Sequence, residues 1–425
     1  MKLLALVALC GCNYLTSSFT VNEFSGDPFP TTVETESGAL VMGMGLPGET
    51  IHTAVLDILS PFTVIDLGPN AQPQIEEPQL VLYGESGSGA FDLARAEVDQ
   101  PDVLLIHPCD DNTITCSVGT PDAPRDYNAI VGMNAFAGDA LRLRLAPDPL
   151  VGTDTIFVLP DIAGSEPSRT IACDAVFPAP YRGGGTAIVG GTEYTFASSR
   201  VTIDACLAPN PDFSIPQSER GVDALFVAST AIGISLLDRS AYDRYRELVT
   251  TAPEYDALPD STVLLPDGPI SGKLTNIPTM DFAGKSTSNT RSPCRQVYAS
   301  RKMLEGNCLA GDDCPCTTDD PNNGTYCGVP AIIELAPPAG FDVLIVDDND
   351  ATIQSLRTEL RPDQPELDGI LGADALRLLE VDLDQPNGRL LGRCQDPTDR
   401  TTCAIRPEIL NEDDNRGQVK LCIGE

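Results

Sequence analysis

Two distant segments of this chain repeat one pattern, and the repeat limits the folds that the chain can adopt. Asn128–Gly132 (NAIVG) and Asp368–Gly372 (DGILG) each place apolar residues directly before a glycine. Both are followed by a short helical pattern and an alternating strand, and the second continues through a Pro386-Asn387-Gly388 turn into another strand. Because a pattern that occurs twice indicates two similar units, we predict a two-lobed protein with an internal pseudo-dyad.

A third stretch, Val55–Leu67 (VLDILSPFTVIDL), has an apolar strand that carries one carboxylate at Asp57, a Ser60-Pro61 turn and a second β-branched strand. It resembles the active-site strand-loop-strand of pepsin-like and retropepsin-like aspartic proteases, whose pattern is an apolar residue, Asp, Thr or Ser, Gly, and Ser or Thr. The chain departs from this pattern at Ile58 and Leu59, which stand where the family has Thr or Ser and Gly.

The resemblance implies a fold, because this family follows each catalytic loop with an apolar-apolar-Gly segment that crosses behind it. We therefore expect a mainly β, two-lobed, pepsin-type double β-barrel with a few short helices and a disulfide-rich insertion. The expected divisions are an N-terminal lobe over 38–168, an inter-lobe hairpin region over 169–210, and a C-terminal lobe over 211–425 with a Cys-rich insertion at 290–330.

The second loop is expected at Ala231–Leu237 (AIGISLL), which resembles the family's Asp-Thr-Gly-Thr-Ser-Leu-Leu. This alignment puts Ala231 at the position of the second catalytic aspartate. A helix should follow over Ser240–Leu248, capped by Asp238 or Ser240. The strand that feeds the loop should come from Val189–Cys206, where glycines 190 and 191 suggest a hairpin.

Peptide hydrolysis in this family needs two carboxylates that share one proton, so that one acts as a base towards water while the other donates to the scissile carbonyl. With Ala231 in the second loop, Asp57 is a remnant without a partner. Asp223 and Asp238 are the nearby candidates for a displaced second acid. Leu59 would also crowd the place where the family's glycine lets the two loops approach.

A hairpin at Gln79–Asp92 resembles the flap that covers the substrate in pepsins, with Tyr83 as the flap tyrosine. Its GESGSG tip does not satisfy the serine-hydrolase pattern G-x-S-x-G around Ser86. The two histidines, His52 and His107, lie in no triad context, and we interpret both as strand or loop residues.

Residues 1–11 have the composition of a short signal peptide, and their apolar run is far below the roughly 20 residues of a spanning helix. Leu9–Cys12 (LCGC) resembles the bacterial lipobox, which implies lipidation at Cys12; an ordinary secretory signal is the alternative. Residues 12–37 are then a lipidated, flexible tether. Asn13 after the lipid site favours the outer membrane over the inner one by analogy with bacterial lipoproteins.

The chain has 14 cysteines, and 12 remain after Cys10 and Cys12 are removed, which fits disulfides formed in an oxidising compartment. Sequence-local pairs are Cys109 with Cys116, Cys173 with Cys206, and Cys394 with Cys403. The other six have no pairing that the sequence fixes: Cys294, Cys308, Cys314, Cys316, Cys327 and Cys422. A zinc site in the 308–327 cluster is the alternative, but no histidine lies nearby and the C-P-C spacing is unusual for zinc.

No cofactor or metal is expected. The acidic 312–323 loop has oxygen ligands that calcium accepts, yet its spacing is not that of an EF-hand, so a solvated insertion is the preferred interpretation. With 27 basic and 62 acidic residues the net charge is −35, which argues against nucleic acid as a partner.

Three functions stay open at this point. The preferred one is an envelope-anchored lipoprotein without peptidase activity that binds a peptide or an envelope protein between its lobes. The alternatives are an active aspartic endopeptidase with a non-standard second carboxylate and a structural surface protein. The lining of the site between the lobes would separate binding from a structural role.

Overall fold

The computed structural model describes the sheets and helices of the chain. The described residues are 28–33, 38–45, 51–60, 63–66, 74–76, 80–83, 90–93, 104–107, 129–136, 140–146, 154–159, 175–177, 181–182, 186–189, 192–195, 200–209, 221–265, 268–283, 293–294, 332–359, 366–384, 389–396, 399, 401–406, 409–410 and 419–420.

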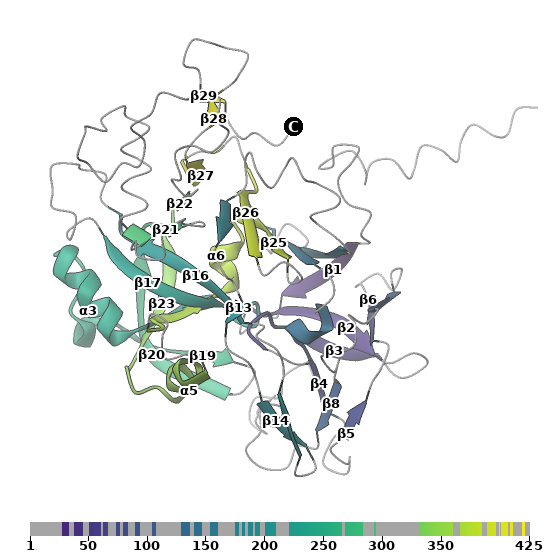
Figure 1. The fold of residues 1–425 in the computed structure, drawn as a ribbon. Coiled ribbons are helices and arrows are strands. Elements are labelled where there is room, and N and C mark those ends of the chain that lie inside the picture. The colour runs from purple at the N-terminus through teal and green to yellow at the C-terminus, as the bar shows by residue number, and fades with distance from the viewer. Residues whose placement is uncertain are drawn as a thin grey trace, which may run out of the picture.

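These residues form a mainly β protein with two large sheets (Figure 1). Two strands, β6 (Leu80–Tyr83) and β7 (Ala90–Leu93), form a hairpin that branches from the first sheet at β2. The main path of this sheet is β12 (Ala175–Phe177), β26 (Arg389–Cys394), β25 (Leu379–Asp384), β10 (Ala140–Arg144), β11 (Asp154–Leu159), β1 (Pro28–Val33), β2 (Leu40–Gly45), β3 (His52–Leu56), β9 (Ala129–Val131), β4 (Thr63–Asp66), β8 (Leu104–His107) and β5 (Gln74–Glu76).

The second sheet carries the other lobe. Beside its main path, β13 (Tyr181–Arg182) pairs with β16. Its path is β19 (Asp260–Leu265), β20 (Gly268–Ile277), β23 (Phe341–Val346), β18 (Ser235–Asp238), β24 (Gly369–Leu371), β17 (Val222–Ala228), β16 (Arg200–Leu207), β21 (Met280–Ala283), β22 (Ile332–Leu335) and β27 (Cys403–Arg406). Two separate hairpins are β14 (Thr186–Val189) with β15 (Thr192–Thr195), and β28 (Ile409–Leu410) with β29 (Val419–Lys420).

Helices are short in the part of the chain that is described. The expected helix near Ser240–Leu248 is confirmed as α3 (Arg239–Leu248), which begins where the Asp238 carboxylate accepts a hydrogen bond from the Ala241 backbone N–H. Ala241, Tyr242 and Tyr245 form its buried face, at helical spacing. The other helical segments are η1 (Met133–Phe136), η3 (Tyr255–Ala257), α5 (Ala351–Glu359) and α6 (Ala373–Leu376).

The lobes share the first sheet, because β25 from the end of the chain pairs with β10, and β26 pairs with β25 and β12 (Figure 1). Strand β10 lies antiparallel to β25 with Arg142 opposite Asp382. Strand β1 lies within residues 12–37, where we expected only a tether; it pairs with β11 and β2, so residues 28–33 are part of the first sheet. The Pro-Thr-rich sequence of β1 lacks the alternation of apolar residues that is typical of a strand.

Each lobe carries the same crossing of strands, which confirms the predicted pseudo-dyad. In the first lobe β9 lies parallel to β3 and antiparallel to β4. In the second lobe β24 lies parallel to β17 and antiparallel to β18. The repeated segments NAIVG and DGILG supply β9 and β24, so the apolar-apolar-Gly segment crosses behind a loop in both lobes.

Candidate functional site

The first loop leaves β3 at Asp57, which is 6% exposed. The Asp57 backbone N–H donates to Val131 O on β9 at 3.0 Å, which fixes the loop to the crossing strand. The chain then turns, because the Leu59 N–H donates to Asp57 Oδ1 at 2.9 Å. This local bond between an aspartate and the backbone two residues later is an Asx-turn.

The second loop repeats these bonds with a hydroxyl in place of the carboxylate. It leaves β17 at Ser229, whose backbone N–H donates to Leu371 O on β24 at 2.9 Å. The Ala231 N–H then donates to Ser229 Oγ at 3.1 Å. Ser229 is therefore the counterpart of Asp57, 172 positions later in the chain.

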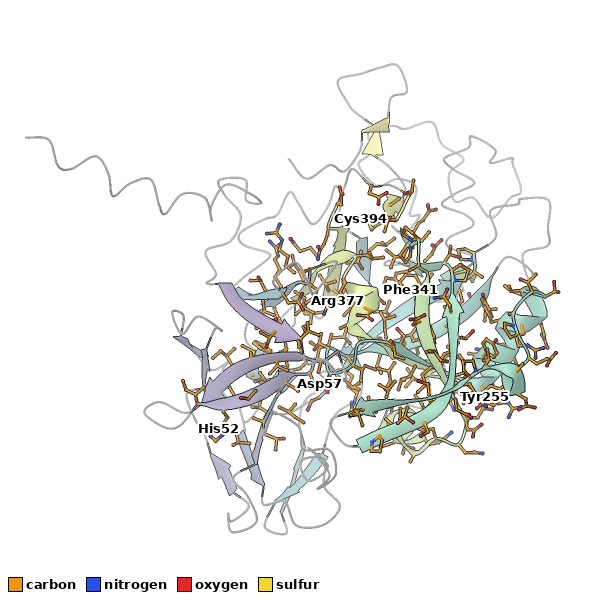
Figure 2. The ribbon with its side chains drawn as sticks, turned by 180° about the vertical axis from the view of Figure 1, so that it is seen from behind. His52, Asp57, Tyr255, Phe341, Arg377 and Cys394 are labelled. Atoms are coloured by element: carbon orange, nitrogen blue, oxygen red, sulfur yellow. A yellow bond between two sulfur atoms is a disulfide. The ribbon has the colours of Figure 1, made fainter. Side chains whose placement is uncertain are left out.

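The two counterparts touch across the pseudo-dyad. Ser229 Oγ donates a hydrogen bond to Asp57 Oδ1 at 2.9 Å, and Ser229 is 1% exposed. Figure 2 shows Asp57 at the junction between the strands of the first sheet and those of the second. The centre of the site is thus one carboxylate and one hydroxyl on facing loops.

One threonine holds the two loops together. Thr230 Oγ1 donates to Leu56 O at 2.6 Å and accepts from the Ile58 N–H at 3.2 Å. Its hydroxyl therefore bonds the first loop both as a donor and as an acceptor. Ile58 is the counterpart of Thr230 and has no hydroxyl, so it cannot return these bonds. Instead, Arg200 on β16 donates from Nη1 to Leu59 O at 2.9 Å.

The glycines that end the two crossing strands are held in the same way. The Gly132 N–H donates to Thr63 Oγ1 at 3.1 Å, and the Gly372 N–H donates to Ser235 Oγ at 3.0 Å. A Cβ at Gly372 would lie 2.4 Å from the backbone oxygen of Gly233, closer than any side chain tolerates. Glycine is therefore required at this crossing.

The structure corrects our alignment of the second loop. Ala231, which we placed opposite Asp57, packs with Ala39 and Val55 in a small apolar cluster. The alignment with the family placed the start of the second loop two residues too late. In this chain Ser229 and Ser235 have the same spacing as Asp57 and Thr63 in the first loop. Comparing the two lobes with each other would have found Ser229, because both loops follow a run of apolar residues.

One further expectation about the second loop also differs. Strand β17 feeds the loop, not a strand within Val189–Cys206. The hairpin around glycines 190 and 191 is confirmed by the pairing of β14 with β15.

Neither alternative acid lies at the centre. Asp223 is near the start of β17, and its Oδ1 accepts from the Cys294 N–H at 2.8 Å. It lies six positions before Ser229 along the strand, a rise of roughly 20 Å. Asp238 caps α3 and forms an ion pair with Arg357 of α5.

The other predicted site residues are placed only in part. Tyr83 ends β6 in the β6–β7 hairpin, and the tip of that hairpin lies outside the described residues, so its flap role stays a prediction. His52 begins β3 and His107 ends β8, so both are strand residues.

Cys12, Ser86 and the 312–323 loop lie outside the described residues. Within those residues no cluster of metal-ligating side chains occurs, and no helix is long and apolar enough to cross a membrane.

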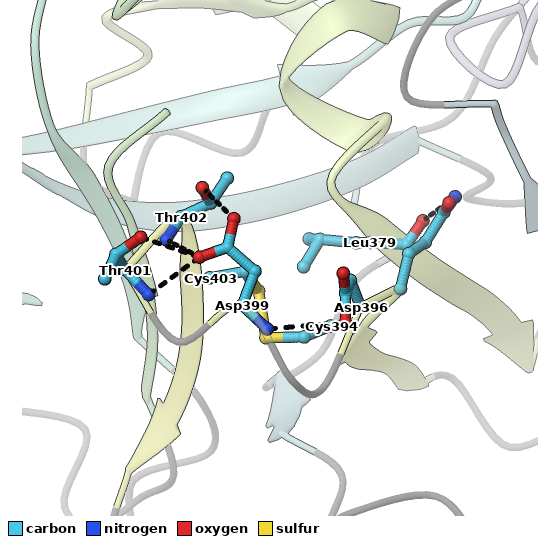
Figure 3. Close-up of a disulfide and its surroundings, with 8 residues drawn as sticks. Leu379, Cys394, Asp396, Asp399, Thr401, Thr402 and Cys403 are labelled. Atoms are coloured by element: carbon cyan, nitrogen blue, oxygen red, sulfur yellow. Dashed lines mark hydrogen bonds between the residues drawn. A yellow bond between two sulfur atoms is a disulfide. The ribbon is translucent and has the colours of Figure 1, made fainter. Parts of the chain in front are cut away.

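Two disulfides are present among the described residues. The predicted Cys394–Cys403 bridge is confirmed, and Figure 3 shows it closing a turn in which Asp399 accepts bonds from the Thr401 and Thr402 hydroxyls at 2.6 Å. The predicted Cys173–Cys206 bridge is wrong, because Cys206 pairs with Cys294. Sequence proximity misled us here, since β16 and residue 294 meet only after the second sheet forms. Residues 109, 116 and 173 lie outside the described part.

Neither a protein-family model nor a curated protein matches the sequence. Among solved structures, an aspartic proteinase from Irpex lacteus is similar over 89% of this chain and 100% of its own, at 10% identity and a TM-score of 0.40. Basic 7S globulin from soybean is similar over 87% of this chain and 95% of its own, at 11% identity and a TM-score of 0.42. The two large sheets and the strand crossing in each lobe give the chain the mainly β, two-lobed architecture that its sequence predicts.

Proposed function

We propose that this protein is a peptide-binding module with an aspartic-protease-like fold and no peptidase activity, anchored to a bacterial envelope by a lipid on Cys12. The observation that carries the proposal is the contact between Asp57 and Ser229. The alternative of a structural surface protein is an outcome of the test below.

The loss of activity follows from the chemistry of the pair. An aspartic protease keeps a proton on one of two close carboxylates, because two like charges at that distance cannot both ionise. A serine hydroxyl forms a hydrogen bond with the carboxylate but is far too weak an acid to protonate the intermediate formed from a scissile carbonyl. Among the described residues, Ser229 stands at the place of the second carboxylate, and its hydroxyl cannot serve as the general acid.

Binding is supported by what the site retains. Both loops, both crossing strands and the Thr230 bonds are present, so the centre is held as rigidly as a catalytic one. Asp57 and Ser229 together offer an acceptor and a rotatable donor, the groups that a peptide backbone needs from its receptor.

The lipid anchor and the envelope address are supported by the sequence Leu9–Cys12. An alkynyl fatty acid fed to expressing bacteria should label the wild-type protein and leave Cys12→Ala unlabelled. Labelling of the variant would contradict the anchor at Cys12.

Function is tested with the full-length mature protein in detergent and its Asp57→Ala variant. We expect neither to cleave an unfolded protein substrate from about pH 3 to about pH 7, and we expect a random peptide library to yield ligands whose binding weakens in Asp57→Ala. Cleavage by the wild type, absent from the variant, would overturn the proposal in favour of a peptidase. A folded protein that selects no peptide would favour a structural role.

A further inference from the structure

We propose that one internal water molecule is bound where β1 meets the second lobe, between the Thr31 hydroxyl, the Asp154 carboxylate and the Arg377 guanidinium. Two buried polar atoms carry this inference. Thr31 Oγ1 and Arg377 Nη2 have no hydrogen-bond partner among the described residues, although Thr31 is only 2% and Arg377 only 4% exposed. The site lies away from Asp57 and does not depend on the proposed function.

Strand pairing brings Thr31 to Asp154. In the antiparallel ladder of β1 and β11, Thr31 lies directly opposite Asp154, and the next residue of β1 pairs with β2 instead. Residues directly opposite each other on neighbouring strands share a face of the sheet, with Cβ atoms roughly 5 Å apart. Both side chains are buried, so this face is closed to bulk solvent. The Thr31 hydroxyl is therefore within reach of a water that also bonds the Asp154 carboxylate.

Arg377 reaches the same carboxylate from the second lobe. Its Nη1 donates to Asp154 Oδ1 at 2.8 Å, to Asp154 Oδ2 at 3.0 Å and to Ala146 O at 3.0 Å. Its Nε donates to Asp374 Oδ1 at 3.3 Å. Nη2 belongs to the same rigid, planar group as Nη1, so it too lies beside the Asp154 carboxylate. Its hydrogens need an acceptor at the place where the Thr31 hydroxyl needs a partner.

Charge and hydrogen bonding together select water as the occupant. Asp154 balances the charge of Arg377, so a metal cation would be repelled by the guanidinium and an anion by the carboxylate. Arg377 Nη2 requires an acceptor, Asp154 accepts, and the Thr31 hydroxyl can do either. A water molecule offers both functions, and buried waters typically make about three hydrogen bonds to groups of this kind.

The water ties β1 to the support of the second loop. Arg377 is the C-cap residue of α6. At the start of this helix, the backbone N–H groups of Ala373 and Asp374 donate to Ile232 O at 2.8 Å and to Gly233 O at 2.9 Å. The bridge therefore connects the N-terminal strand of the first sheet, through one short helix, to the loop that faces Asp57.

A high-resolution crystal structure of the full-length mature protein in detergent is the first test. We expect one water within hydrogen-bond distance of both Thr31 Oγ1 and Arg377 Nη2. A chloride ion at this position, a protein group that bonds both atoms directly, or the absence of any density there would overturn the inference.

Thr31→Val gives a second test, in which the sign of the change decides. Valine has nearly the shape of threonine, but it leaves a bound water without one of its buried partners. The equilibrium constant for unfolding in urea should therefore rise about fivefold. A buried hydroxyl that bonds nothing would instead weaken the folded state, so an unchanged or smaller constant in Thr31→Val would overturn the inference.

Thr262→Val is the matched control, because it deletes a hydroxyl that bonds Ser271 at an exposed position on β19. Its unfolding constant should stay within about twofold of the wild-type value. If Thr31→Val does not fold, the crystal structure of the wild type decides the matter.

Discussion

Arg142 and Asp382 form a two-pronged ion pair on neighbouring strands of the first sheet, although they are 240 positions apart in the chain. Arg142 Nε lies 2.5 Å and Nη2 2.7 Å from the two carboxylate oxygens of Asp382, and Arg142 is 1% exposed. Because β10 and β25 are counterparts in the two lobes, the pseudo-dyad passes through this pair. This contact between the lobes is therefore ionic and buried.

Removal of one member should destabilise the protein strongly. Arg142→Met leaves the buried Asp382 carboxylate without its cation, which costs about 3–5 kcal/mol in other proteins. The double variant Arg142→Met/Asp382→Leu should be more stable than Arg142→Met alone, because it removes the buried carboxylate that lost its cation. Glu380, which also pairs with Arg142 at 3.4 Å, keeps Arg144 at 3.7 Å in both variants. Urea unfolding measures both. Lys273→Met, which breaks a pair with the exposed Asp260, should change little. Equal losses in the single and double variants would contradict this account.

Thr230→Val should destabilise the junction of the loops. Valine has nearly the shape of threonine, but Leu56 O and the Ile58 N–H would then both lack their buried partner, at about 1–3 kcal/mol for each group. Thermal unfolding of Thr230→Val beside the exposed Thr262→Val gives the comparison. Equal midpoints for the two variants would mean that Thr230 does not hold the loops.

Asp368 should make stability depend on pH. Burial raises its pKa above the ordinary aspartate value, and this outweighs the opposing bonds from the Leu225 N–H and from Arg244. A raised pKa means that the folded state binds the proton more tightly, so the contribution of Asp368 is greatest below the ordinary pKa and is lost as the pH rises through the folded value. The unfolding free energy of the wild type relative to Asp368→Asn should therefore fall with rising pH. A difference that grows with pH would refute this.

Asp399 provides a control, because its pKa is shifted in the opposite direction to that of Asp368. Hydrogen bonds from Thr401 and Thr402 lower its pKa, so its contribution is present above the ordinary aspartate pKa and is lost as the pH falls through the lower, folded value. The unfolding free energy of the wild type relative to Asp399→Asn should rise with pH over the acidic range. Parallel slopes for the two variants would contradict both assignments.

The two disulfides should differ in their effect on stability. Cys206–Cys294 spans 88 positions and Cys394–Cys403 spans 9, so loop-closure entropy predicts losses of about 4–5 and about 2–3 kcal/mol when each is replaced by two alanines. Unfolding in guanidinium without reductant measures both. A larger loss from the shorter bridge would show that local packing, not chain entropy, sets their contributions.

Local signals in the sequence predicted the elements whose pattern repeats within a few residues. The crossing strands β9 and β24, the cap of α3 by Asp238, and the Cys394–Cys403 bridge each have a signal within a few consecutive residues. Strand β1 was missed because its Pro-Thr-rich sequence has no apolar alternation. The Cys206–Cys294 bridge was missed because its two cysteines lie 88 positions apart.

The sequence by itself determined that the chain has two β lobes with a repeated strand crossing and that Asp57 begins one of the two loops. Only the tertiary structure decided what faces Asp57. A shift of two residues along the second loop exchanges Ala231 for Ser229, and the sequence pattern accepts either choice. The hydrogen bonds to β24 and across the pseudo-dyad identify Ser229 as the residue opposite Asp57, because it follows β17 at the point where the two loops meet.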